Sequence, residues 1–141
     1  MSLHPEFAAR ILRGEKRVEF RRRALGRDTT DLIIYATAPV RAVVGVAEIE
    51  RVKQGSPTSL WNAFRGVAGI ERGPFFDYFE GVTEGFAYVL GPVRACASPL
   101  RLGMAGLPMN PPQAFQYITT RTLDAVLRKA LPRIETAQTL G

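Results

Sequence analysis

The chain alternates between segments with helical and with strand-like spacing of apolar residues. Short helices are predicted where apolar residues recur every three or four positions, and strands where they alternate or form short runs. The predicted helices cover residues 7–14, 56–66, 71–79, 112–118 and 122–131. The predicted strands cover residues 17–21, 31–37, 41–52, 85–90 and 93–97. This order favours an α+β fold in which a small barrel of mixed topology carries short helices at its ends.

Glycine and proline refine the boundaries of these elements. Gly45, inside the third strand, indicates a bulge or a bend. Gly91 and Pro92 predict a break between the last two strands. Ser56 and Pro57 suit the N-cap and the first turn of the second helix.

Two of the predicted elements should supply core side chains. On the first strand Val18 and Phe20 should point into the core, because side chains alternate across a strand. This strand is therefore predicted to be half-buried, with Arg17, Glu19 and Arg21 together on its other face. The third helix places its aromatic residues on one face, which is more typical of a core than of a ligand-binding surface. These residues are Phe75, Phe76 and Phe79.

Composition limits the class of protein. The 141 residues suit a single domain spanning residues 1–141, since domains usually have about 100–150 residues. Cys96 is the single cysteine and His4 the single histidine, which excludes an intramolecular disulfide and a four-cysteine zinc site. We expect neither a metal nor a cofactor. Because no apolar run resembles a signal peptide or a membrane span, we expect a cytoplasmic protein without membrane contact.

The formal net charge of +6 favours anionic partners, with nucleic acid first among them. The same charge is also compatible with a general role in solubility. The sequence carries no signal for an oligomeric state.

A short motif gives the chain a family resemblance. Residues 14–21 read Gly-Glu-Lys-Arg-Val-Glu-Phe-Arg and match the pattern G-x-K-x-x-E-x-R. This pattern, after a short helix and at the first strand, resembles the ASCH family, which has a PUA-like barrel fold. The resemblance spans residues 3–117, and the helix predicted over residues 122–131 lies beyond it. It implies an RNA-binding domain or a coactivator-like domain; some members are ribonucleases and others deacylate N4-acetylcytidine.

Within the motif, Lys16, Glu19 and Arg21 are the main candidates for a functional site. A carboxylate beside two cations favours its own charged form and holds both cations in place. The cations can then donate to a phosphate or to a base edge. The alternative is an exposed salt bridge worth about 0–1 kcal/mol.

Further candidates for nucleic-acid contacts lie around the motif and in later segments. The run Arg21-Arg22-Arg23 suits phosphate contacts, or forms a solvated strand end. Tyr35 and Thr37 lie where a strand leads into a proline loop. Further along the chain, the Gln113 amide suits a hydrogen bond to a base edge, or alternatively serves as a helix cap. The Tyr117 ring suits stacking on a base. The complete set of binding candidates is Lys16, Arg21, Arg22, Arg23, Tyr35, Thr37, Gln113 and Tyr117.

Several functions remain compatible with these residues. The first is a module that binds RNA or a modified nucleotide without turnover. The second is a metal-independent ribonuclease, with Lys16 as cation or acid, Glu19 as base and Tyr35 as a positioning group. The resemblance to nucleoside amidohydrolases carries their lysine to Lys16, but their threonine falls on Glu19, so that nucleophile is missing. An inert structural or partner-binding domain is a further alternative.

Overall fold

The computed structural model describes residues 1–26, 29–108, 110–111 and 120–129 of the chain. All statements on the structure refer to these residues. The strands are β1 (Ser2–Leu3), β2 (Val18–Arg21), β3 (Asp31–Ala36), β4 (Ala42–Gly55) and β5 (Gly85–Leu100). The α-helices are α1 (Pro5–Leu12), α2 (Pro57–Phe64), α3 (Arg72–Tyr78) and α4 (Thr120–Leu127). Two short 3₁₀ helices are η1 (Arg65–Val67) and η2 (Met104–Gly106).

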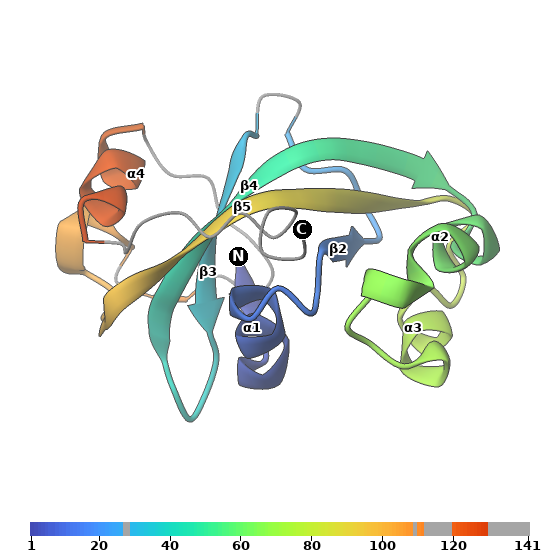
Figure 1. Cartoon of the computed structure of the whole chain (residues 1–141), viewed down its shortest axis with the longest axis horizontal. Helices are drawn as coiled ribbons and strands as arrows, with labels where there is room; N and C mark the ends of the chain where they lie inside the picture. The colour runs from blue at the N-terminus through green and yellow to red at the C-terminus, as the bar shows by residue number, and fades with distance from the viewer. Residues whose placement is uncertain (27–28, 109, 112–119, 130–141) are drawn as a thin grey trace, which may run out of the picture.

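The strands form one sheet in the order β1-β3-β4-β5-β2. The β1–β3 pair is parallel, and the other pairs are antiparallel. Helices cover parts of this sheet, so the predicted α+β class is confirmed (Figure 1). Among the described residues the sheet ends at β1 on one side and at β2 on the other. Closure into a PUA-like barrel therefore stays a prediction.

The long strands β4 and β5 form a curved ribbon that runs through the molecule (Figure 1). The bulge expected at Gly45 is confirmed by a register shift in both neighbouring pairings. A Cβ atom at Gly45 would come within 2.6 Å of Leu12 Cδ2, so the glycine also allows α1 to pack closely on the ribbon.

The break predicted at Gly91 and Pro92 is wrong, because β5 continues through it. These two residues lie opposite the single residue Glu48, between regular pairs on either side. Proline has no N–H to donate, and a bulge is a place where a strand tolerates that loss. Pairing with β4 therefore keeps β5 continuous, although glycine and proline locally favour a break.

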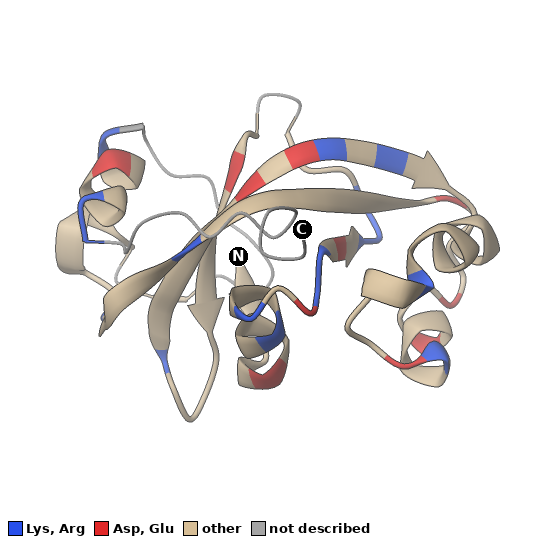
Figure 2. Ribbon diagram, in the orientation of Figure 1, with Lys and Arg blue, Asp and Glu red and all other residues tan. Residues whose placement is uncertain are grey.

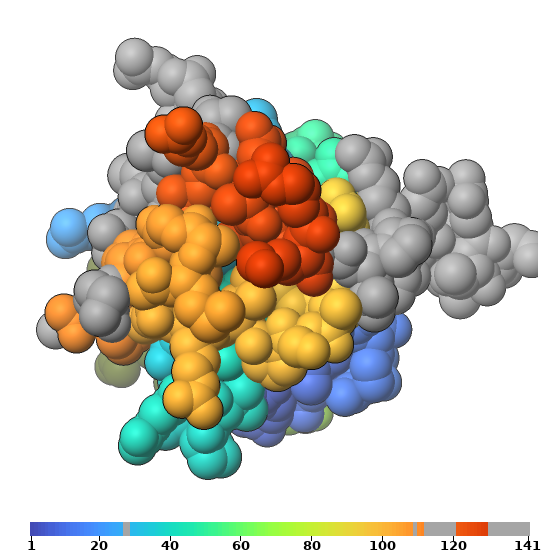
Figure 3. Space-filling model, turned by 90° about the vertical axis from the view of Figure 1, so that its left-hand side faces the viewer, coloured from blue at the N-terminus to red at the C-terminus, as the bar shows by residue number. Residues whose placement is uncertain are grey.

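The ends of the ribbon carry two separate groups of helices. Residues 57–78, which comprise α2, η1 and α3, form the connection between β4 and β5 at one end, and we call them the helical lobe (Figure 1). At the other end α4 packs against η2, as the space-filling view shows (Figure 3). The C-terminal helix predicted over residues 122–131 begins two residues earlier, and its last two predicted residues lie outside the described ones. The helix predicted over residues 112–118 also lies outside them.

The core of the helical lobe agrees with the sequence analysis. The Ser56 hydroxyl accepts a hydrogen bond from the Ser59 N–H at 3.1 Å, and Pro57 is the first helical residue, so the predicted N-cap is confirmed. The rings of Phe75 and Phe79 are buried, which confirms them as core residues. Phe76 packs against the same cluster but is only partly buried.

The predicted burial of β2 is only half right. Val18 and Phe20 are buried in the cluster that includes the lobe, as expected. Glu19, on the opposite face, keeps only 6% of its surface exposed. The charged face of β2 therefore does not point into solvent.

No helix in the described part of the chain is both long and apolar enough to cross a lipid bilayer. The cytoplasmic location and the single domain over residues 1–141 stay predictions.

Candidate nucleic-acid interface

The turn between α1 and β2 fixes the position of Lys16. Gly14 follows α1 with a φ of +77°, a left-handed conformation that favours glycine at a helix end. The N–H groups of Glu15 and Lys16 both donate to the Arg10 carbonyl, at 2.9 and 3.1 Å. The next N–H, of Arg17, donates to the Val67 carbonyl at 2.9 Å. The motif is therefore held against η1 from its first residues.

Three charged side chains of the motif form one ion-pair network. Glu19 Oε1 lies 3.8 Å from Lys16 Nζ, and Glu19 Oε2 lies 3.1 Å from Arg21 NH2. Lys16 is 3% exposed and Glu19 6%, whereas the Arg21 side chain is 13% exposed. The carboxylate thus bridges two cations in a site with little water, where such pairs are screened far less than on the surface. The alternative of an exposed salt bridge is excluded by this burial.

Burial lowers the pKa of Lys16 below its usual value of 10.5, because a buried ammonium loses its hydration. The Glu19 carboxylate opposes this effect and raises the pKa, while the positive charges of Arg10 and Arg21 lower it further. The ammonium also lies 5.6 Å from the Phe7 ring centre and 5.4 Å from that of Phe20, where ring faces attract a cation.

A segment of the helical lobe covers Lys16. The Lys16 ammonium donates to the Ala68 carbonyl at 2.6 Å. A Cβ atom placed on Gly69 would lie 2.5 Å from Lys16 Cβ, so the backbone at Gly69 touches the lysine stem. Arg10 fixes the same segment by donating to the Gly69 carbonyl at 2.7 Å. Lys16 is therefore covered by the helical lobe and does not face an opening to solvent.

Arg21 is the member of the network nearest to solvent. Its Nε–H is buried and has no acceptor among the described residues. Burial raises the pKa of the neighbouring Tyr78 above its usual 10.0. The positive charge of Arg21 lowers this pKa, and the negative charge of Glu19 raises it further. Hydrogen bonds from the Arg22 backbone and the Arg21 side chain also lower that pKa. The neutral Tyr78 hydroxyl is thus part of the same polar cluster.

Sequence reasoning did not place Tyr78 in the site. A signal was present, since Tyr78 is the only tyrosine in an α3 segment otherwise rich in phenylalanine. A buried tyrosine hydroxyl needs a polar partner, and phenylalanine would serve equally well if packing were its only role.

The other predicted site residues lie in different surroundings. Arg22 and Arg23 are exposed, next to Arg21, and Arg22 donates to the Glu80 carbonyl at 3.3 Å. Figure 2 shows basic residues in blue where the chain leaves β2. Tyr35 is buried in the hydrophobic cluster that contains α4 residues, and is thus packed apart from Lys16. Thr37 is partly buried, and its N–H donates to the Leu3 carbonyl at 2.9 Å. Gln113 and Tyr117 lie outside the described residues.

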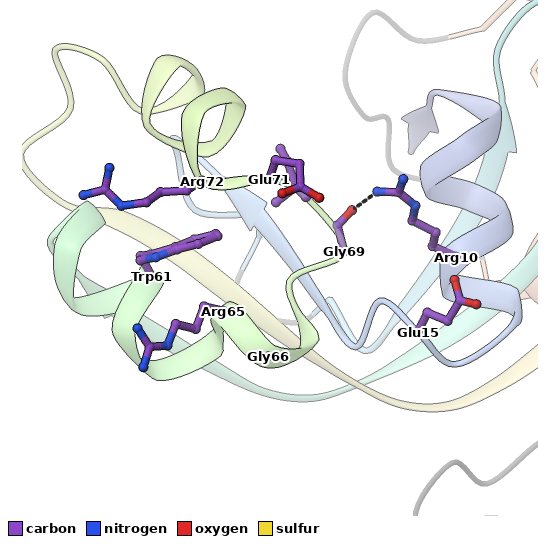
Figure 4. Close-up of a pocket in the computed structure, with 9 residues that line it drawn as sticks. Arg10, Glu15, Trp61, Arg65, Gly66, Gly69, Glu71 and Arg72 are labelled. Atoms are coloured by element: carbon purple, nitrogen blue, oxygen red, sulfur yellow. Dashed lines mark hydrogen bonds between the residues drawn. The ribbon is translucent and has the colours of Figure 1, made fainter.

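An open pocket of about 460 Å³ lies beside the network (Figure 4). Arg10 and Glu15 form one side of it, and the helical lobe forms the other and contributes the ring of Trp61. Gly69, which covers Lys16, belongs to its wall. Among the described residues, no group of three or more histidine, cysteine, aspartate or glutamate side chains could hold a metal ion.

Comparisons with known proteins agree with the motif. The chain is 42% identical over 91 residues to an ASCH domain-containing ribonuclease of Zymomonas mobilis; the alignment covers 64% of this chain and 62% of that protein. It is 26% identical over 104 residues to the large ribosomal subunit protein uL22 of Ureaplasma parvum, covering 33% of it.

Solved structures match over more of the chain. The crystal structure of an ASCH protein from Zymomonas mobilis matches with a TM-score of 0.83 and 31% identity, covering 93% of this chain and 94% of that one. Two single-residue mutants of that protein match with TM-scores of 0.82. A family model described as the ASCH domain matches residues 1–86, and the chain therefore belongs to the ASCH domain family.

Proposed function

We propose that this chain is an RNA-binding ASCH module that contacts phosphates through Arg21, Arg22 and Arg23. The observation that carries the proposal is the run of three arginines at the end of β2, in which Arg22 and Arg23 are exposed beside an Arg21 that is paired with Glu19. A phosphate oxygen is a strong acceptor for a guanidinium. Glu19 orients the Arg21 guanidinium, and Lys16 holds Glu19 from the other side.

The charge and the relatives support RNA as the partner. The net charge of +6 favours a polyanion. One relative is named a ribonuclease and another a protein of the large ribosomal subunit. The matched region covers only part of each of these relatives, so their whole activities are not carried over.

The test is salt-dependent binding of a labelled single-stranded RNA. Each phosphate neutralised contributes about 0.7 to the slope of log affinity against log salt concentration. Replacing Arg22 and Arg23 with glutamine should reduce that slope by about 0.7 for each arginine that contacts a phosphate. Arg101→Gln is the matched control, because Arg101 is exposed and lies near η2 at the other end of the ribbon. An affinity that does not change with salt, or an equal loss in the control, refutes the proposal.

A second candidate function, metal-independent RNA cleavage, is favoured by the name of the Zymomonas relative. In that reaction Glu19 would take a proton from the attacking group, and Lys16 would give one to the leaving group. The arrangement of the network argues for binding instead. Both oxygens of Glu19 already face cations, and Lys16 is covered by Ala68 and Gly69.

Glu19→Gln separates the two functions, because the amide keeps the shape but cannot act as a base. For a binding module, RNA affinity should stay equal or rise, since a negative charge has left the site. For a nuclease, binding should survive while cleavage of a labelled strand falls about 100-fold or more. The assay is run in chelator, which suppresses contaminating metal-dependent nucleases. No cleavage by the wild type across varied RNAs eliminates the second candidate.

A further inference from the structure

We propose that the pocket beside the network is a stacking subsite for one base of a single-stranded RNA, with Trp61 as the stacking surface and Arg65 and Arg72 as phosphate contacts. This inference rests on the proposed RNA-binding function and assigns it a second contact region. We call this region the Trp61 pocket.

The size and openness of the Trp61 pocket suit a nucleotide. Its volume of about 460 Å³ lies within the range of about 300–1,000 Å³ that is common for small-ligand sites. It lies between α1 on one side and the helical lobe on the other (Figure 4). A strand can therefore place one base in the pocket while its backbone continues over the surface.

Trp61 packs against the core on one side and is only partly buried. Its ring centre lies 5.1 Å from that of Phe75 and 6.2 Å from that of Phe76, at tilted angles. These contacts fix the indole from the core side, while the residue remains only partly buried. A fixed, accessible aromatic ring is what single-stranded nucleic-acid sites use for stacking, worth about 1–3 kcal/mol per base.

Two arginines flank the indole. In Figure 4 the ring of Trp61 lies between the side chains of Arg72 and Arg65. The Arg72 guanidinium lies 4.9 Å from the ring centre of Phe76, which braces it beside Trp61. Arg65 follows Trp61 by four positions, on the same side of the helical turn. A base on Trp61 thus has a cation on each side for its neighbouring phosphates.

The charge of the pocket suits a polyanion. The described part of its lining holds three arginines and two glutamates. One of the glutamates, Glu15, is paired with Arg13 outside the pocket at 2.9 Å. The remaining balance is therefore positive, as a phosphate backbone requires.

The Trp61 pocket also adjoins the buried network. Its wall includes Gly69, whose backbone touches the Lys16 stem. The preceding carbonyl, of Ala68, accepts the Lys16 hydrogen bond. A strand held in the pocket would lie against the segment that covers Lys16.

The experiment uses the fact that Trp61 is the only tryptophan in the chain. Its fluorescence therefore reports on this pocket alone. The wild type is titrated with a labelled oligoadenylate and with an abasic oligomer of equal length, and label anisotropy and tryptophan emission are followed together. We expect the oligoadenylate to quench the emission over the same concentration range as it binds. The abasic oligomer should bind more weakly and leave the emission unchanged.

Variants test the energetic contribution. Trp61→Ala should weaken oligoadenylate binding about 5- to 150-fold, the equivalent of the 1–3 kcal/mol for stacking. Trp61→Phe should recover most of this loss, because phenylalanine also stacks, and it guards against a folding defect in the alanine variant. Arg65→Gln should weaken binding more than the matched control Arg101→Gln.

The outcomes separate this inference from the proposed function. If RNA binds with the expected salt dependence but Trp61→Ala binds as tightly as wild type, the stacking subsite is refuted and the RNA-binding function stands. Equal quenching by the abasic oligomer also refutes stacking. If no RNA binds to the wild type, the proposed function itself fails.

Discussion

Replacing Gly69 with alanine tests the contact between the helical lobe and Lys16. Gly69 has a φ of +62°, and a side chain in the left-handed region costs about 1–2 kcal/mol. The new Cβ would also lie 2.5 Å from Lys16 Cβ and 2.8 Å from Lys16 Cγ. Because Lys16 Cβ is attached to the backbone, side-chain rotation cannot relieve this clash, and overpacking of this kind costs about 1–3 kcal/mol.

The free energy of unfolding of Gly69→Ala should therefore fall by about 2–5 kcal/mol, measured by urea denaturation followed by circular dichroism. At about 3 °C per kcal/mol for a domain of this size, the melting temperature should fall by roughly 6–15 °C.

Two other glycines separate strain from clash. Gly81 has a φ of +78° but open space around its Cβ position, so Gly81→Ala should cost only the backbone strain of about 1–2 kcal/mol. Gly73 lies in α3 with open space and no positive φ, so Gly73→Ala should be neutral or stabilise by up to about 1 kcal/mol. If Gly69→Ala loses no more stability than Gly81→Ala does, the backbone at Gly69 does not pack closely against Lys16.

Further predictions concern the network and the aromatic core. Glu19→Leu should lower the free energy of unfolding by about 3–5 kcal/mol, and by more than Lys16→Met does, because it leaves the buried Lys16 and the partly buried Arg21 without a carboxylate. Urea titrations compare the two variants. Since the Lys16 pKa is lowered from 10.5, the unfolded state binds more protons just below that pH, so this group makes stability rise as pH approaches 10.5. The stability of Lys16→Met should lack that rise, so the rise should appear as the difference between the pH profiles of the wild type and the variant. Phe75→Ala should lower the free energy of unfolding by about 3–5 kcal/mol, and Phe76→Ala should lower it by less, because Phe76 is only partly buried. Thermal melting curves of the two variants compare these losses.

The local features of the fold followed from the sequence because their causes lie within a few residues. The N-cap at Ser56 depends on one hydroxyl and a nearby N–H, and the bulge at Gly45 on the lack of a side chain. The motif likewise determined that Glu19 and Arg21 would pair, since they lie two residues apart on one strand.

Features that depend on contacts between distant segments could not be predicted from the sequence. Alternation in β2 indicates two faces but not what covers each of them. Lys16 is buried because Ala68 and Gly69, some fifty residues later, fold over its side chain. The continuity of β5 through Pro92 similarly depends on its pairing with β4, which a local reading of proline does not include.

The attachment of the helical lobe has a consequence for amide hydrogen exchange. The Arg17 N–H is bonded to the Val67 carbonyl, next to the Ala68 carbonyl that holds the Lys16 ammonium. Any opening that uncovers Lys16 by moving this segment also frees the Arg17 amide. Amides exchange with solvent only from such open states, so protection reports the free energy of opening. The exchange rate at Arg17 therefore sets an upper limit on how often Lys16 can meet a ligand in solution.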